Sequence, residues 1–241
     1  MNKIKNDSVK RIIYLLIGIA IFILYYKIIP DLFKYVYNHY LNFSNKILKS
    51  TFLISMEITI FLILFLIFRK TILEDLKKFK NDYRKKLDIG FKYYFIGIFI
   101  MIISNLILAA ITGDIAKNEE LNREYLKMYP VYSIIAMVVL GPTIEELVFR
   151  LGFRKAFKSW LPYALFSGLL FGGLHAYTAF EGMSFQEALK HWVYALYTIP
   201  YGALGFAFAK VYYDTKNICT TALIHTIHNA FSIFLIFFAM R

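Results

Sequence analysis

Apolar runs of about twenty residues alternate with shorter polar stretches along most of the chain. A hydrocarbon core of about 30 Å is crossed by roughly 20 apolar residues in helical conformation. The pattern therefore predicts an all-α fold, a polytopic transmembrane helix bundle with about seven spans. Asp31–Lys49 is a possible eighth element, which we interpret as an interfacial helix or loop. The predicted spans are Ile12–Ile29, Phe52–Phe68, Phe91–Ile111, Val131–Phe149, Leu161–Tyr177, Trp192–Tyr213 and Ile218–Met240.

The composition agrees with this pattern. Of the 241 residues, 59% are hydrophobic and 18% are charged, against roughly a quarter charged in ordinary soluble domains. These values exclude a disordered chain, a collagen-like fibre and a disulfide scaffold, and they disfavour a soluble enzyme. The single cysteine, Cys219, cannot form an internal disulfide. We predict one membrane domain over residues 1–241, with N-terminal helices at 1–128 and a chemically richer helix core at 129–241.

The chain has a net charge of +12, and most of its Lys and Arg residues lie between the apolar runs, where anionic lipid headgroups are expected. This placement disfavours nucleic acid as a partner and favours the lipid bilayer. Lys and Arg are most frequent in the N-terminal tail and in the connection Arg69–Lys86, which predicts that both lie in the cytoplasm. We expect a multi-pass protein of the cell membrane whose first span is an uncleaved anchor and whose Arg69–Lys86 connection is an amphipathic helix.

Ionisable and polar residues inside the predicted spans are unevenly distributed. Glu57 is the only acidic residue of the first three spans, and their two lysines, Lys27 and Lys92, lie near span ends, whereas the last four spans carry several ionisable residues. Charged groups at bilayer depth are energetically unfavourable and mark function by default. The sequence therefore predicts that the active site lies in the C-terminal four helices. The helices of this half carry, in or directly after the predicted spans, Glu145, Glu146, Arg150, His175, His225, His228 and Asn229.

The first polar motif is Gly141-Pro142-Thr143-Ile144-Glu145-Glu146-Leu147-Val148-Phe149-Arg150, in which the proline suggests a break or kink in the helix. Glu146 and Arg150 are one helical turn apart and can pair, whereas Glu145 points about 100° away and has no cation beside it in the sequence. A carboxylate without a cation and away from water is a stronger base than an exposed one. The alternative is that both glutamates are ordinary charges at the membrane edge.

Two further motifs follow on later spans. Phe171-Gly172-Gly173-Leu174-His175 ends a span rich in small residues, which allow close helix packing. His225-Thr226-Ile227-His228-Asn229 places His225 and Asn229 one turn apart on an otherwise apolar helix. A single histidine in a membrane helix is often a mere interhelical hydrogen-bond partner. Together, however, the motifs place glutamate, histidine and asparagine side chains on three helices, which favours a lined cavity.

Glu-Glu-x-x-x-Arg, Phe-x-x-x-His and His-x-x-x-Asn, in this order, resemble the CPBP family of intramembrane proteases. This family, also called Abi, contains CAAX prenyl endopeptidases and bacteriocin-processing or immunity proteins. The resemblance covers about residues 130–240, and all three motifs match without a departure. It implies a membrane-embedded endopeptidase in which Glu145 and His175 activate a water and His225 and Asn229 stabilise the oxyanion. Glu146 and Arg150 are then supporting residues.

The family has been described both as zinc metalloproteases and as metal-independent glutamate proteases. The sequence has no His-Glu-x-x-His motif, and Arg150 beside the glutamate pair disfavours a divalent cation. We therefore predict no cofactor, with zinc bound by one glutamate and two histidines as the alternative.

Four functions remain open at this point. The leading prediction is an endopeptidase acting on a membrane-associated peptide or protein. The richness in Ile, Lys, Asn and Phe is typical of a low-GC bacterial genome, so we expect a leader peptide, pheromone or bacteriocin-related substrate. The alternatives are a non-catalytic bacteriocin immunity or scaffolding protein, a zinc-dependent CAAX-type metalloprotease, and an ion pathway lined by glutamate and histidine. The sequence does not indicate the oligomeric state.

Overall fold

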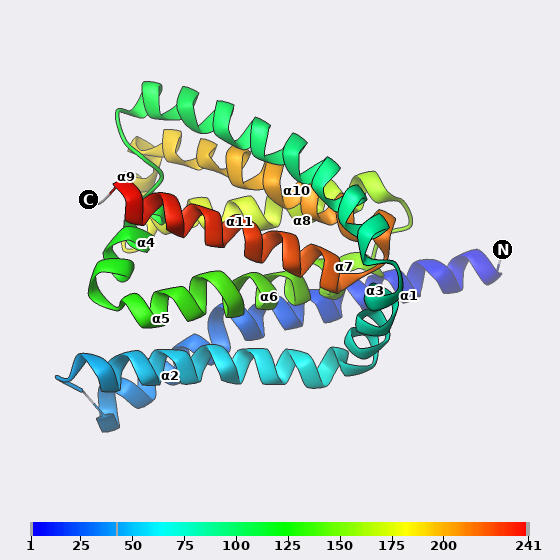
Figure 1. Ribbon diagram of the computed structural model, residues 1–241, viewed down its shortest axis with the longest axis horizontal. Helices are drawn as coiled ribbons and strands as arrows, with labels where there is room; N and C mark the ends of the chain where they lie inside the picture. The colour runs from blue at the N-terminus through cyan, green and yellow to red at the C-terminus, as the bar shows by residue number, and fades with distance from the viewer. Residues whose placement is uncertain (1, 42, 240–241) are drawn as a thin grey trace.

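The computed structural model describes residues 2–41 and 43–239, and all regular elements within these ranges are helical (Figure 1). This confirms the predicted all-α bundle. The α-helices are α1 (Asn2–Ile23), α2 (Ile29–Val36), α3 (Lys46–Thr112), α4 (Lys117–Met128), α5 (Pro130–Ile134), α6 (Gly141–Glu146), α7 (Gly152–Arg154), α8 (Trp160–Tyr177), α9 (Phe185–Lys190), α10 (Thr198–Thr215) and α11 (Ile218–Ala239). Segments of π-helix lie at Leu24–Ile28, Tyr37–Leu41, Ile135–Leu140 and Leu147–Leu151, and 3₁₀ segments at Thr178–Phe180 and Trp192–Tyr197.

Four continuous helical stretches in the described chain are long and apolar enough to cross a membrane: Asn6–Leu41, Lys46–Thr112, Pro130–Arg154 and Ile218–Phe238. Helix α3 turns back on itself and contains the predicted spans Phe52–Phe68 and Phe91–Ile111 in its two arms (Figure 1). Its direction changes where Asp82 leaves helical geometry, at φ −141° and ψ 34°. The predicted amphipathic connection between the arms is helical, and its cytoplasmic placement stays a prediction.

Two predicted boundaries need revision. Trp192–Tyr213 is not one helix, because Trp192–Tyr197 forms a 3₁₀ segment and α10 begins at Thr198, two residues before Pro200. A proline lacks the backbone N–H that a helix interior needs, so it favours a helix start. The possible element Asp31–Lys49 is helical as far as Leu41, where it continues α1, and Asn42 lies outside the described residues. Met240, at the end of the last predicted span, is also outside them.

Helices α8 and α10 pack with their backbones in close contact. A Cβ atom added at Gly172 would lie 2.5 Å from the backbone nitrogen of Gly202, and one added at Gly168 would lie 2.8 Å from the carbonyl oxygen of Gly202. Only small residues permit helices in a membrane to approach this closely. This packing fixes the end of α8 that carries His175 against the start of α10.

The start of α11 is held by the connection within α3. The buried carboxylate of Asp75 accepts a hydrogen bond from the backbone N–H of Ile218 at 2.9 Å. The side-chain amide of Asn217 donates to the carbonyl oxygen of Asp75 at 2.7 Å. A helix start leaves backbone N–H groups without partners, so an acidic side chain supplied by another element is stabilising there. The contact sets the position of α11, which carries His225 and Asn229.

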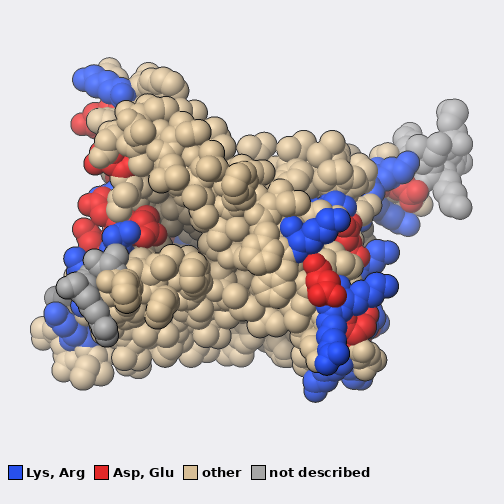
Figure 2. Space-filling model, turned by 45° about the horizontal axis from the view of Figure 1, so that its top comes forward, with Lys and Arg blue, Asp and Glu red and all other residues tan. Residues whose placement is uncertain are grey.

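Charged side chains gather at two opposite ends of the molecule and leave a broad belt between them almost free of charge (Figure 2). Helix α4 lies at one end and the bend of α3 lies at the other (Figure 1). Such a belt matches the hydrocarbon region of a bilayer, with the charged ends at its two aqueous faces.

Candidate active site

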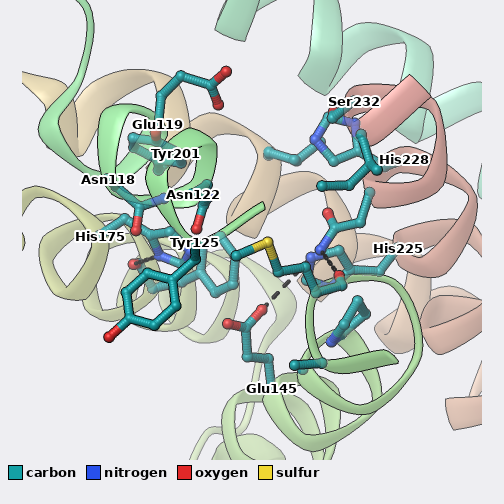
Figure 3. Close-up of a pocket in the computed structure, with 18 of the residues that line it drawn as sticks. Asn118, Glu119, Asn122, Tyr125, Glu145, His175, Tyr201, His225, His228 and Ser232 are labelled. Atoms are coloured by element: carbon teal, nitrogen blue, oxygen red, sulfur yellow. Dashed lines mark hydrogen bonds and ion pairs between the residues drawn. The ribbon is translucent and has the colours of Figure 1, made fainter. Parts of the chain in front are cut away.

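A cavity of about 340 Å³ brings together residues from all three polar motifs. Glu145, His175, His225 and Asn229 all line it, although they come from α6, α8 and α11. Figure 3 shows His175 and His225 on opposite sides of the cavity with Glu145 between them. The convergence that the motifs predicted is therefore present. The role of each residue in catalysis stays a prediction.

Of the break or kink predicted at Pro142, the break is absent, because the helical stretch that carries Glu145 is continuous. Before the proline the chain adopts π-helical geometry, in which the N–H of Gly141 bonds to the carbonyl of Ala136. Its usual acceptor in an α-helix, the carbonyl of Met137, is thereby released, and Pro142 has no N–H to donate. The side-chain amide of Asn229 donates to this carbonyl at 2.7 Å. The proline thus creates an acceptor that anchors α11 beside the cavity.

Behind the cavity, Glu146 and Arg150 form a fully buried ion pair, as their spacing predicted. Nε of Arg150 lies 2.8 Å from Oε2 of Glu146, and Nη2 lies 3.2 Å from Oε1. Both side chains are 0% exposed. Nη1 of Arg150 donates to Ser167 at 2.5 Å, and the guanidinium lies 5.4 Å from the ring centre of Phe171. A buried charge is tolerated only with such complete pairing.

His225 connects the two glutamates, a contact that sequence reasoning missed. Its Nδ1 donates to Oε1 of Glu146 at 2.9 Å, and its Nε2 lies 3.6 Å from Oε2 of Glu145. Sequence reasoning left Glu145 without a partner because it considered only residues on the same helix. The structure supplies one from α11. Phe208 and Phe171 pack on the His225 ring at 4.6 and 5.8 Å, which restricts its orientation.

His175 is oriented by its own helix. Its Nδ1 lies 2.9 Å from the carbonyl oxygen of Phe171, one turn earlier. A carbonyl only accepts, so Nδ1 carries the proton and Nε2 of the neutral ring has a free lone pair. The ring stacks on Tyr201 with a centroid distance of 4.8 Å. His175 can therefore accept a hydrogen bond from a water in the cavity.

Several cavity residues were not predicted as site residues. Asn118, Glu119, Asn122 and Tyr125 come from α4, a polar helix that the hydrophobic pattern left as a connection. Glu57 comes from α3, and its isolation in an apolar span was the only sign of its position. His228 also lines the cavity and lies 3.3 Å from the hydroxyl of Tyr94. Contacts between elements that are distant in the sequence bring these residues to the cavity, and local sequence patterns do not predict such contacts.

The residues of the cavity do not form a ready metal site. Across residues 2–41 and 43–239, no three His, Cys, Asp or Glu side chains are placed to hold one ion. Zinc sites in proteins use three or four such ligands.

Comparisons with known proteins show similarity to a membrane endopeptidase family over part of the chain. Residues 127–231 match the family described as type II CAAX prenyl endopeptidase Rce1-like. A Bacillus subtilis (strain 168) protein named "Putative membrane peptidase YdiL" is 27% identical over 161 residues, which is 63% of this chain. The matched region spans 59% of that relative's length. No solved structure matches the chain significantly. Residues 127–231 are thus similar to the Rce1-like endopeptidases, in agreement with the resemblance that the three motifs indicated.

Proposed function

We propose that this protein is an intramembrane endopeptidase that hydrolyses a peptide bond of a membrane-associated peptide or protein. The observation that carries the proposal is the convergence of Glu145, His175, His225 and Asn229 on one cavity. The similarity to the Rce1-like endopeptidases and the name of the Bacillus subtilis relative support a membrane peptidase. A leader peptide, pheromone or bacteriocin-related peptide is the proposed substrate class.

In the proposed reaction, a water lies between Glu145 and His175. Nε2 of His175 accepts a hydrogen bond from this water, and the Glu145 carboxylate takes one of its protons. The resulting hydroxide attacks the carbonyl carbon of the substrate. Negative charge then develops on the former carbonyl oxygen. The C–N bond breaks as Glu145 returns the proton to the amide nitrogen, so Glu145 acts first as base and then as acid.

His225 and Asn229 are proposed to stabilise the oxyanion. Nδ1–H of His225 donates to Glu146, and this hydrogen bond orients Nε2 toward Glu145. The Glu146 carboxylate also stabilises the protonated form of the ring, whose Nε2–H can donate to the oxyanion. The Asn229 amide has two N–H hydrogens. One donates to the carbonyl oxygen of Met137, and the other is available to the oxyanion. The Glu146–Arg150 pair holds His225 in place from behind.

Mass spectrometry of candidate peptides incubated with the purified protein in detergent tests the proposal. We expect cleavage by the wild type and a ~10²–10⁴-fold lower rate with Glu145→Gln, which removes the base but retains the shape. Glu74→Gln, on the exposed connection within α3, is the matched control and should cleave normally. Full turnover by Glu145→Gln would contradict the role of Glu145 as base. A wild type that cleaves nothing would favour the non-catalytic immunity or scaffolding role.

The orientation of the cavity is a second part of the proposal. The α4 residues that line the cavity lie at the end of the molecule opposite the basic connection in α3 (Figure 1). If that connection is cytoplasmic, as its Lys and Arg content predicts, the cavity opens toward the outer face of the membrane. The substrate would then be a peptide presented outside the cytoplasm.

Cysteine labelling in intact cells tests this orientation. In a Cys219→Ser background, a membrane-impermeant maleimide should label Glu120→Cys, on the exposed face of α4. Lys77→Cys, on the exposed face of the α3 connection, should react only after the cells are permeabilised. The reverse pattern would overturn the orientation and leave the proposed chemistry untouched.

A further inference from the structure

Glu57 contributes an unpaired carboxylate to the cavity from the N-terminal half of the chain. It lies on the first arm of α3 and lines the same cavity as Glu145. Within the described chain, none of the hydrogen bonds or ion pairs involves Glu57. The other two cavity glutamates are paired, since Glu145 faces His225 and Glu119 contacts Arg123 at 3.1 Å. Glu57 is therefore the one carboxylate of the described lining residues that lacks a partner.

The cavity as a whole is suited to a cation. Three glutamates line it, and no Lys or Arg is among its described lining residues, although the whole chain carries a net charge of +12. On the face that Figure 2 shows, the exposed Lys and Arg side chains lie instead at the two ends of the molecule, and the buried Arg150 is paired with Glu146 behind the cavity. Among the three carboxylates, that of Glu57 is left without a counter-charge by the described residues and is available to a ligand that enters the cavity.

The surroundings of Glu57 also fit a protonated amine or a guanidinium. Tyr25 and Tyr132 line the same cavity, and Glu57 is close enough to act electrostatically on both rings and on Glu145. Aromatic faces beside a carboxylate stabilise a bound cation. Two carboxylates on one cavity also repel each other when both are ionised, so a substrate cation between them is stabilised by both.

We propose that Glu57 determines specificity by binding a Lys or Arg side chain of the peptide substrate, a few residues from the cleaved bond. The inference rests on the proposed peptidase function and adds a substrate class to it. Glu57 takes no part in bond breaking and acts by positioning the peptide over Glu145. Loss of one partner of a desolvated charge pair weakens binding by about 30-fold or more.

An N-acetylated peptide library, incubated with the full-length protein in detergent micelles and read by mass spectrometry, tests this role. The wild type should select Lys or Arg at one fixed position relative to the cleaved bond. Glu57→Gln should lower kcat/KM for such peptides by about 30-fold or more. Glu57→Lys should shift the selection at that position to Asp or Glu, which a purely structural role would not do. A parallel library with free N-termini separates recognition of a side chain from recognition of the terminal amine.

Glu119→Gln is the matched control, because it removes the same charge from the same cavity at a carboxylate that is already paired with Arg123. It should leave the basic preference in place. A second readout uses the inactive Glu145→Gln variant, whose thermal stabilisation by the selected basic peptides should disappear when Glu57→Gln is added. This readout does not depend on turnover, and the isosteric glutamine keeps the test informative if Glu57→Lys does not fold.

The outcomes separate the two proposals. Cleavage by the wild type without a fixed basic position, or an unchanged profile in both Glu57 variants, overturns the role of Glu57 and leaves the peptidase function standing. Selection of the free terminal amine alone also overturns it. A wild type that cleaves no library member overturns both proposals together.

Discussion

The N-terminal and C-terminal helices bury their apolar residues to very different extents. Within the most apolar window of each stretch, 17% of residues are buried in Asn6–Leu41 and 11% in Lys46–Thr112. The corresponding values are 39% for Pro130–Arg154 and 33% for Ile218–Phe238. The first two stretches therefore present most of their side chains to lipid, whereas the last two present many of theirs to other helices.

This difference explains where the polar residues lie. A helix that faces lipid can bury no charge at low cost, so its sequence is restricted to apolar residues. A helix enclosed by other helices can hold Glu146, Arg150 and His225, because each finds a partner there. Glu57 is the exception, and it lies where the lipid-facing α3 contacts the cavity. Whether a helix can contain ionisable residues therefore depends more on its packing against other helices than on its overall hydrophobicity.

The largest effect is expected from the buried ion pair of the C-terminal helices. Glu146→Gln leaves the Arg150 guanidinium buried without a counter-charge, and the expected loss of stability is about 3–5 kcal/mol. Thermal unfolding in detergent measures it. The comparison variant in the N-terminal helices is Lys27→Gln, whose pair with Asp31 is exposed, and its unfolding temperature should not change. Equal losses of stability in Glu146→Gln and Lys27→Gln would contradict the difference in burial between the N-terminal and C-terminal helices.

The second-largest effect is expected at Asn229, where a substitution tests whether the side chain acts in catalysis or only in helix packing. Removing one oxyanion donor costs roughly 3 kcal/mol of barrier, or ~10²–10³ in rate. Asn229→Ala should therefore lower kcat far more than it raises KM, since the interaction forms mainly in the transition state. The bond from Asn229 to the Met137 carbonyl predicts an additional loss of stability of about 1–3 kcal/mol. Activity must therefore be measured per folded molecule.

His228 is the internal control for Asn229. It lies on the same helix and lines the cavity, but it is outside the family motif and contacts Tyr94. His228→Ala should have a mild effect on turnover. Loss of activity in His228→Ala together with retention in His225→Ala would place the last motif one helical turn away. Normal kcat in folded Asn229→Ala would leave Asn229 a packing residue only.

The sequence was sufficient for the features that depend on local spacing. Apolar runs predicted the helices, and the i,i+4 spacing predicted the Glu146–Arg150 pair. Features that depend on contacts between distant elements were missed. The π-helical turns around Pro142 do not alter the apolar pattern, so the sequence indicated only a break or kink there and not the π-helical geometry. The contact of His225 with Glu145 joins two helices that the sequence alone does not orient.

The third effect concerns close packing between α8 and α10. An added Cβ at Gly172 would collide with the backbone at Thr198 and Gly202, so Gly172→Ala should destabilise the fold by about 1–3 kcal/mol. Gly173 is the matched control, because nothing lies within 4 Å of an added Cβ there. Gly173→Ala should raise stability by about 0.5–1 kcal/mol through its better helix propensity. Unfolding temperatures of both variants check the pair, and a tolerated Gly172→Ala would contradict the close helix contact.

The smallest effect is expected from removal of divalent metal ions. If Glu145 and His175 activate the water alone, treatment with a strong chelator should leave the cleavage rate unchanged, while a zinc peptidase treated in parallel loses activity. Among the described residues, no three potential ligands surround one point. The guanidinium of Arg150, held against Glu146, also adds positive charge next to the glutamate pair, which disfavours a dication. Complete loss with chelator and recovery with zinc would instead make Glu145, His175 and His225 metal ligands. The enclosed C-terminal helices would then have to move to gather the ion, and the zinc-bound water would replace the water activated by Glu145 and His175.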